Sequence, residues 1–215
     1  MYVPKHFREE DQNRLLQYID NYSFGMLVVA DEAGIEVNHV PFHLIRGGED
    51  AVGYLQCHLA RANPIWRRVQ GGARVLAVFQ GPNAYISPSW YPTKAETGRV
   101  VPTWNYLAVH VQGAARIVED SDWLARHVRD LTDRHEAATE NPWSVDDAPA
   151  EFTERLLNAI VGVEIAIEEL TGKLKASQNQ PERNREGVRR GLESSDGSQA
   201  QAMAPFLEST RPADR

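Results

Sequence analysis

The chain has 215 residues, a net charge of −7 and 42% hydrophobic residues, which is typical of a folded globular protein with a sizeable core. Its single cysteine, Cys57, excludes an internal disulfide and a cysteine-rich zinc site, and we expect it to be a small buried side chain. The N-terminus has no apolar signal region, and the longest apolar run, 24–30, is too short to cross a membrane. These features predict a cytoplasmic protein without membrane contact.

The elements expected first along the chain are a helix over 8–20 and a series of short strands. Leu15, Leu16 and Ile19 fall on one helical face. Strands are predicted at 24–30, 35–45 and 51–57, with turn sequences at 31–34 and 46–50. A short helix is expected to begin near Pro64, with Asn63 as its N-cap.

The second half of the chain repeats this mixture of strands and helices. Val161, Val163, Ile165 and Ile167 occupy alternate positions and should share one face of a strand. The expected strands are 73–80, 83–87, 105–118, 161–170 and 173–177, and the expected helices are 121–139, 150–159, 181–193 and 202–209. A flexible connection is predicted over 194–201, and the C-terminal end is expected to fray.

Six or more closely spaced antiparallel strands favour a mainly β protein with peripheral helices, of the α+β class, built as a barrel or a sandwich. The sequence has no GxGxxG and no GxxxxGK[ST] motif, which argues against a Rossmann or P-loop nucleotide site.

The charge is distributed unevenly along the chain. Between 119 and 154 there are eleven acidic residues and three arginines, a net charge of −8. Between 56 and 106 there are six basic residues and one acidic residue, a net charge of +5. The basic region suits a small anionic ligand such as a phosphate, although its side chains can equally be solvated surface residues. A nucleic-acid surface would usually be more basic over the whole domain.

The segment 56–66, QCHLARANPIW, places His58, Arg61 and Asn63 where a strand ends and a helix begins. Helix N-termini bind phosphates, and an arginine adds a fork that matches phosphate oxygens. The alternative is that Asn63 only caps the helix and Arg61 is solvated. His58 and His110 suggest a metal or a haem, but no ligand spacing supports either, so we expect no metal.

The segment 81–106, GPNAYISPSWYPTKAETGRVVPTWNY, combines aromatic rings, prolines and hydroxyl groups. Its rings can wall a planar cofactor, its polar side chains can bind the edge of that cofactor, and prolines stiffen the loop. Packing within the protein is the alternative role of these rings.

Several motifs resemble the PaiB-like FMN-binding negative transcriptional regulators. They are HLARANPIW, GPNAYISPSWYPTK, VVPTWNYLAVHVQG, PWSVDDAP and AIVGVEIAIEELTGKLKASQN. The resemblance begins at residue 1 and extends to about residue 192. It implies an FMN-binding antiparallel split β-barrel, similar to flavin reductases and pyridoxamine-phosphate oxidases. It also implies a homodimer with FMN at the subunit interface, held partly by residues of both chains.

The resemblance assigns the FMN phosphate to the turn 58–63 and the rest of the flavin to three later motifs. The implied cofactor-binding residues are His58, Ala60, Arg61, Asn63, Ser87, Ser89, Trp90, Tyr91, Lys94, Thr103, Trp104, Asn105, Tyr106, Ser177, Gln178 and Asn179. The chain departs from the family pattern in three small ways. ASQN replaces the more usual LSQN, Asn21-Tyr22-Ser23 stands where a proline often precedes Phe-Gly, and Cys57 occupies a position where the pattern is glycine-like. None of these changes lies among the residues assigned to the phosphate.

We expect an FMN-binding domain over 1–180 and a helical extension with a flexible tail over 181–215. The resemblance implies a negative transcriptional regulator, although the net charge and the lack of a helix-turn-helix make direct DNA binding doubtful. An FMN-dependent oxidoreductase acting on an unknown small molecule is the alternative, and a haem-handling split barrel is a third hypothesis.

Overall fold

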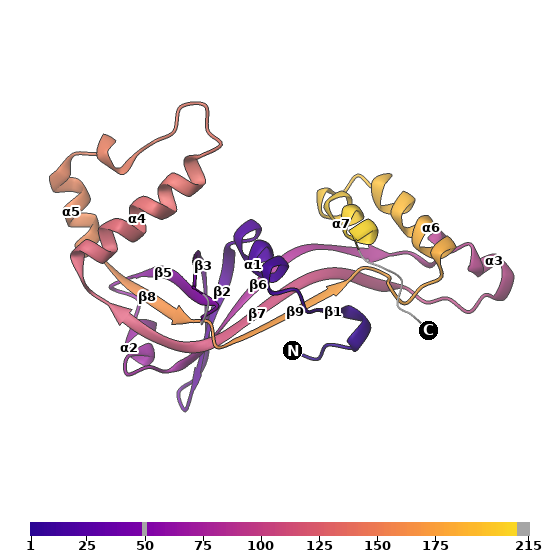
Figure 1. Ribbon diagram of the computed structural model, residues 1–215, viewed down its shortest axis with the longest axis horizontal. Helices are drawn as coiled ribbons and strands as arrows, with labels where there is room; N and C mark the ends of the chain where they lie inside the picture. Colours follow the sequence, from indigo (N-terminus) through magenta and orange to yellow (C-terminus); the bar gives the residue numbers. More distant parts are fainter. Residues whose placement is uncertain (49–50, 210–215) are drawn as a thin grey trace. The chain divides into compact units, whose positions relative to one another are not determined.

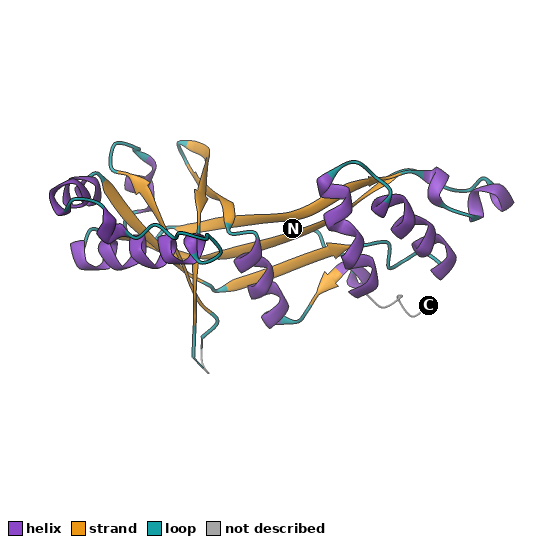
Figure 2. Ribbon diagram, turned by 90° about the horizontal axis from the view of Figure 1, so that it is seen from above, coloured by secondary structure: helices purple, strands orange, loops and turns teal. Residues whose placement is uncertain are grey.

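The computed structural model of the chain describes residues 1–48 and 51–209, and this part contains nine strands and seven α-helices (Figures 1 and 2). The strands are β1 (Arg8–Glu9), β2 (Phe24–Asp31), β3 (Gly34–Pro41), β4 (His43–Arg46), β5 (Gly53–Ala60), β6 (Arg74–Ile86), β7 (Thr103–Val118), β8 (Ile160–Ala166) and β9 (Glu169–Lys175). The α-helices are α1 (Gln12–Asn21), α2 (Ile65–Val69), α3 (Thr93–Thr97), α4 (Ser121–Glu136), α5 (Ala150–Asn158), α6 (Glu182–Glu193) and α7 (Ser198–Ser209). Short 3-10 helices lie at Lys5–Phe7, Pro88–Trp90 and Val145–Asp147.

The strands form one open sheet in the order β3-β2-β6-β7-β8-β5-β4, and β9 pairs with β7 and β1. All pairings with a defined register are antiparallel. The predicted mainly β, α+β architecture is therefore the one observed. Parts of the predicted 46–50 turn and of the C-terminal end lie outside the described residues.

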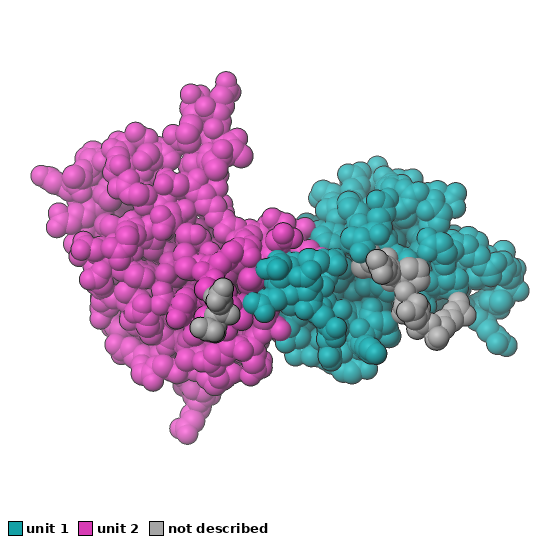
Figure 3. Space-filling view, viewed as in Figure 1, with its two compact units in different colours: residues 1–15, 80–109, 171–215 teal, residues 16–79, 110–170 magenta. Residues whose placement is uncertain are grey.

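The chain divides into two compact units, drawn in different colours in Figure 3. Unit 1 comprises 1–15, 80–109 and 171–215, and unit 2 comprises 16–79 and 110–170. The long strands β6 and β7 contribute residues to both units. The predicted boundary at residue 180 stays a prediction.

The core of unit 2 follows from alternating side chains on paired strands. Leu55, Cys57 and Leu59 of β5 are buried, and Cys57 pairs with Val163 of β8, which is buried on the same face. Burial raises the pKa of the Cys57 thiol to about 12, so the expected small buried cysteine is confirmed.

The opposite face of β5 and β8 in unit 2 is covered by α4. This helix begins where the Asp120 carboxylate accepts a 2.7 Å hydrogen bond from the amide of Trp123, a typical N-cap. The Trp123 ring packs directly on Gly162 of β8, where a Cβ atom would come within 2.3 Å of the ring. Residue 162 must therefore be glycine for α4 to lie this close to the sheet.

Several element boundaries differ from those predicted. A break was expected at Gly81-Pro82-Asn83, but β6 continues through it, because Gly81 lets the strand approach Leu107 of β7 within unit 1. The predicted strand 161–170 is two strands, β8 and β9, because the Ile167 and Glu168 amides donate to the Gly53 and Gln112 carbonyls instead.

Other differences lie near the ends of the chain. Arg8 and Glu9 pair with β9, so the first helix begins at Gln12 rather than at residue 8. The helix α7 begins at Ser198, inside the segment predicted to be a flexible connection.

Candidate functional site

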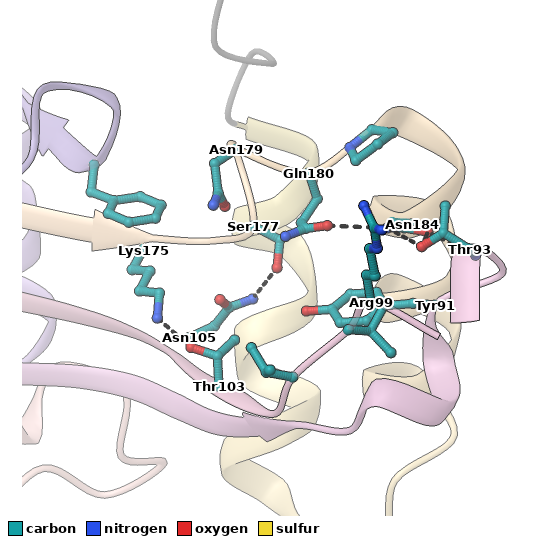
Figure 4. Close-up of a pocket in the computed structure, with 14 residues that line it drawn as sticks. Tyr91, Thr93, Arg99, Thr103, Asn105, Lys175, Ser177, Asn179, Gln180 and Asn184 are labelled. Carbon is teal, nitrogen blue, oxygen red and sulfur yellow. Dashed lines mark hydrogen bonds between the residues drawn. The ribbon is translucent and has the colours of Figure 1, made fainter. Parts of the chain in front are cut away.

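A pocket of about 440 Å³ lies in unit 1, which is within the usual size range of small-molecule sites (Figure 4). Its walls come from the connection between β6 and β7, the start of β7, the end of β9 and the start of α6. The lining residues are Phe7, Tyr91, Thr93, Arg99, Val100, Val101, Thr103, Asn105, Lys175, Ser177, Asn179, Gln180, Pro181 and Asn184.

Asn105 is the most unusual side chain of the pocket. It is fully buried, and its Nδ2 donates a 2.9 Å hydrogen bond to Oγ of Ser177. Its Oδ1 is buried and has no hydrogen-bond partner within the described part of the chain. Ser177 has a φ of 59°, the left-handed conformation that non-glycine residues rarely adopt. A buried acceptor without a partner costs free energy unless a ligand or water binds it.

Lys175 brings a positive charge to the same pocket. Its Nζ donates a 2.5 Å hydrogen bond to Oγ1 of Thr103. Partial burial, and secondarily the charge of Lys173, lowers the pKa of the Lys175 ammonium. Across the pocket, burial raises the pKa of the Tyr91 phenol, which therefore stays a neutral hydroxyl (Figure 4).

The loop between β6 and β7 is fixed to α6. Asn184 of α6 bonds to the Thr93 hydroxyl, and Arg183 of α6 makes a two-pronged ion pair with Glu96 at 2.6 and 2.7 Å. The Trp90 ring packs on α6 at Gly191. This wall of the pocket is consequently preorganised.

The predicted phosphate turn lies in unit 2, and its polar groups bond to the protein itself. Arg61 pairs with Glu119 at 2.5 Å and donates to the carbonyl oxygens of Asn158 and Ile160. Asn63 donates to Oδ1 of Asn38 and accepts from the amide of Ile65, the first residue of α2, but the N-cap of this helix is Pro64 rather than the predicted Asn63. The helix that follows, α2, is short, as expected, and with only five residues it places little positive charge at its N-terminus.

Five of the residues predicted from the sequence come together in the unit 1 pocket, namely Tyr91, Thr103, Asn105, Ser177 and Asn179. Others in unit 1 stand beside it without lining it. Ser87, Ser89 and Lys94 bond among themselves, and Gln178 bonds to the main chain of Leu174 and Ala176.

Trp104 is 54% exposed and contacts Tyr85, whereas the Tyr106 ring lies under the Lys173 ammonium. The turn residues His58, Ala60, Arg61 and Asn63 belong to unit 2. Their role as ligands of FMN stays a prediction.

The sequence interpretation missed the two cations of the pocket, Lys175 and Arg99. In the predicted strand 173–177, Lys175 stands two residues before Ser177, so the alternation of side chains was a usable signal, although β9 itself ends at Lys175. Arg99 lies in an irregular segment, where no periodicity shows the direction of a side chain.

Two further properties concern the described residues as a whole. Within them, no group of three or more His, Cys, Asp and Glu side chains is arranged to hold a metal ion. None of the helices in 1–48 and 51–209 is long and apolar enough to span a membrane.

The open antiparallel sheet with helices at its periphery defines a split-barrel protein. This fold is shared with the FAD and haem binding protein of Mycobacterium smegmatis, at 15% identity, a TM-score of 0.56, and coverage of 86% of this chain and 80% of that one. It is also shared with a conserved hypothetical protein of Mycobacterium tuberculosis, at 14% identity, a TM-score of 0.58, and coverage of 84% and 94%. At these identities the likeness shows the fold alone.

Residues 1–169 match the family described as "Putative FMN-binding domain", and the chain belongs to this family. It is 33% identical over 208 residues to "Protease synthase and sporulation protein PAI 2" of Bacillus subtilis, with 97% of both chains covered. An uncharacterized protein of Emericella nidulans is 33% identical over 227 residues, with 90% of both covered. The PaiB-like family, the split-barrel fold and FMN as the cofactor, all predicted from the sequence, are confirmed.

Proposed function

We propose that the pocket of unit 1 receives the flavin ring of FMN and that the chain acts as a flavin-dependent regulatory protein. The observation that carries this proposal is the buried Oδ1 of Asn105, an acceptor without a partner among the described residues. A flavin ring has an N–H donor between two carbonyl oxygens, and this edge complements an amide oxygen beside cations and hydroxyl groups.

The other residues of the pocket fit the same ligand. Lys175 and Arg99 offer donors to the carbonyl oxygens of the ring, and Thr103 and Tyr91 offer hydroxyl groups. Val100, Val101 and Phe7 supply apolar surface for the faces of the ring. Bound FMN would supply hydride or electron transfer, while the protein contributes position and charge.

Separately from the pocket of unit 1, the turn at 58–63 in unit 2 is proposed as a binding site for a phosphate group. Arg61 can contact a phosphate only by giving up part of its bonding to Glu119 and to two carbonyl oxygens. His58 is free of such competition from carboxylates in the described part of the chain, and it is the better candidate within this turn.

We further propose that the chain is a homodimer. The outer face of β2, β3 and β6 in unit 2 is apolar apart from His39, and its side chains are part-exposed or exposed. Phe24 is 68% exposed and Ile35 is 76% exposed on this face. The apolar residues that share it are Phe24, Met26, Val28, Ala30, Ile35, Val37, Leu76 and Val78. A largely apolar sheet face of this kind is typical of a protein interface, and a second copy of the chain presents a matching surface.

The dimer can be tested by placing a charge in this face. Val37→Lys is expected to give a monomer by light scattering, because a lysine would be buried without a partner in the interface. The matched control, Glu32→Lys, adds the same side chain in the β2–β3 turn and should leave the dimer intact. A Val37→Lys protein that remains a dimer would show that the interface lies elsewhere.

Regulation by this chain is proposed to occur in the cytoplasm without direct reading of duplex DNA. The segment 119–154, which includes α4 and α5 of unit 2, carries a net charge of −8 and would repel phosphates. Duplex binding is expected to be no tighter than about 10⁻⁴–10⁻⁶ M at physiological salt. A sequence-specific nanomolar shift in a mobility assay would overturn this part of the proposal.

The second candidate function is an FMN-dependent oxidoreductase, and the charge of Lys175 in the pocket favours it. A cation beside a flavin stabilises the anionic reduced form. The central experiment is therefore anaerobic. Purified protein should bind about one FMN per chain, and mixing it with NADH or NADPH should leave the flavin absorbance unchanged if the role is regulatory. Rapid bleaching would establish the oxidoreductase, and failure to bind FMN would overturn both functions.

A further inference from the structure

A pair of histidines is buried beneath α4 in unit 2, outside the pocket of unit 1. His127 of α4 is 1% exposed, and its ring stacks on Trp123 with centroids 5.1 Å apart. Its Nε2 lies 3.1 Å from Nδ1 of His58, at the end of β5 where the predicted phosphate turn begins. Nδ1 of His127 is buried and has no hydrogen-bond partner within the described residues.

This geometry selects one arrangement of protons. If His58 donated from Nδ1, the proton of His127 would lie on its own Nδ1, a buried donor without an acceptor. If His127 donates from Nε2, its Nδ1 is a bare nitrogen, and an unpaired acceptor is more easily tolerated than an unpaired N–H. In the second arrangement Nδ1 of His58 accepts, and its proton is on Nε2.

We propose that His127 is a positioning residue that fixes His58 as its Nε2–H tautomer, a neutral donor held ready for an anionic group of the ligand. The inference rests on the proposed function only in taking that group to be the phosphate of FMN. Trp123 holds the plane of the His127 ring, and the β5–β8 pairing of His58 with Gly162 leaves room for it. A helix far from the turn in sequence would thereby set the hydrogen-bonding state of the turn.

The surroundings of the pair keep both rings neutral. Burial lowers the pKa of His58, and burial, followed by the proximity of His58 and His43, lowers that of His127 to about 3. In the described part of the chain neither ring bonds to a carboxylate. The other titratable and charged groups that face this cluster from the packed elements are His43 on β4, Asp130 and Arg134 on α4, Asp20 on α1 and Glu164 on β8. Asp20 bonds to Arg46 and Arg134, and Glu164 bonds to Gln56 and Arg116, so these carboxylates are already paired.

The tautomer can be measured without any flavin. Long-range ¹H–¹⁵N spectra at pH 7 are expected to show His58 protonated at Nε2 and bare at Nδ1. In His127→Phe, which keeps a ring against Trp123 but has no donor, His58 should become a mixture of tautomers. A wild-type His58 protonated at Nδ1 would overturn the inference, whether or not the protein binds FMN.

Binding measurements then test the consequence for the ligand. His127→Phe should weaken the binding of FMN by roughly two- to tenfold, which is the effect of one hydrogen bond. The affinity for riboflavin should not change, because riboflavin has no phosphate. His127→Gln places an amide donor near the position of Nε2 and should restore FMN affinity to within about twofold of wild type. His135→Gln, an exposed change on the same helix, should match wild type.

Two results of these titrations would contradict the inference. One is an equal loss of FMN and riboflavin in His127→Phe, which would mean a purely structural role. The other is a loss of FMN affinity in His127→Gln that equals the loss in His127→Phe. A wild-type protein that binds neither flavin would instead refute the proposed function, and the spectra would still decide the tautomer.

Discussion

The pocket of unit 1 and the turn at 58–63 in unit 2 use their polar groups in opposite ways. In the pocket, the Asn105 amide keeps a buried oxygen without a partner among the described residues. In the turn, Arg61 bonds to one carboxylate and two carbonyl oxygens, and Asn63 bonds through both ends of its amide. The pocket therefore has hydrogen-bonding capacity that the fold does not use, whereas most of that capacity in the turn stabilises the fold.

This difference shows what a cationic motif can and cannot establish. An arginine and an asparagine at the junction of a strand and a helix are suited to a phosphate, but they are equally suited to joining β5 to the segment before β8. A fully buried acceptor without a partner is more specific evidence, because the fold gains nothing from leaving it unpaired.

The largest effect on flavin affinity is expected from Asn105→Leu, which replaces the amide with an apolar side chain of similar volume. Flavin affinity should fall by roughly 10- to 100-fold, since the N–H of the ring would be buried without an acceptor. The affinities for FMN and riboflavin should fall equally, because both ligands carry the same ring. Titration by flavin fluorescence measures both.

Ser177→Ala is the matched control for this change, because it removes only the partner of Nδ2 and leaves Oδ1 in place. It should cost several-fold less affinity than Asn105→Leu. Unchanged affinity in Asn105→Leu would place the ring outside this pocket.

The next largest effect is expected on the pH dependence of the unfolding free energy, through His127 of unit 2. The pKa of His127 is lowered to about 3 in the folded chain, against about 6.5 when unfolded. The unfolded state therefore binds a proton that the folded state does not between these two values. The contribution of neutral His127 to the unfolding free energy is complete above pH 6.5. It falls by up to about 1.4 kcal/mol per pH unit as the pH decreases towards 3.

His127→Phe removes this contribution, so its unfolding free energy should fall less steeply than that of wild type between pH 6.5 and 5. Urea denaturation at several pH values measures the two slopes, and His135→Gln serves as the exposed control. Identical slopes in wild type and His127→Phe would mean that His127 is protonated as readily in the folded protein as in the unfolded chain.

A smaller effect is expected from Arg61→Ala. The lost bonds to Glu119, Asn158 and Ile160 should lower the unfolding free energy by about 1 kcal/mol, since the side chain is partly exposed and the ion pair is screened. FMN and riboflavin affinity should change together and only slightly. A selective loss of FMN by tenfold or more would instead place Arg61 on the phosphate.

The fold was largely accessible from the sequence because buried and exposed side chains alternate along most of its strands. Val161, Val163 and Ile165 are all fully buried, as their spacing predicted. The missed continuity of β6 through Gly81-Pro82 has a non-local cause, the close approach to Leu107, which no local pattern contains. The division of 161–170 into two strands likewise depends on partners more than fifty residues away.

The candidate site was accessible only in part, and for a similar reason. Hydroxyl groups, amides and rings near 87–106 indicated a polar pocket, and Asn105 and Ser177 do meet there across 72 residues of sequence. That one amide oxygen would remain unpaired depends on the packing of three elements, which composition cannot show. The pairing of His58 with His127 is equally non-local.

The smallest effect is expected from Lys175→Met, which keeps the length of the side chain and removes its charge. The Lys175 ammonium is partly solvated and shares a hydrogen bond with Thr103, so its loss should weaken flavin binding by only about two- to fivefold. In wild type, affinity should decrease as the pH rises through the lowered pKa of Lys175, because only the ammonium carries the charge. The variant should lack this dependence at alkaline pH, and flavin titrations from pH 7 to 10 measure it. Lys5→Met, at an exposed lysine of the N-terminal 3-10 helix, is the control for charge removal in the same unit. If Lys175→Met and Lys5→Met behave alike, the lysine of the pocket does not contact the flavin, and the ring must be held by the neutral groups around Asn105 alone.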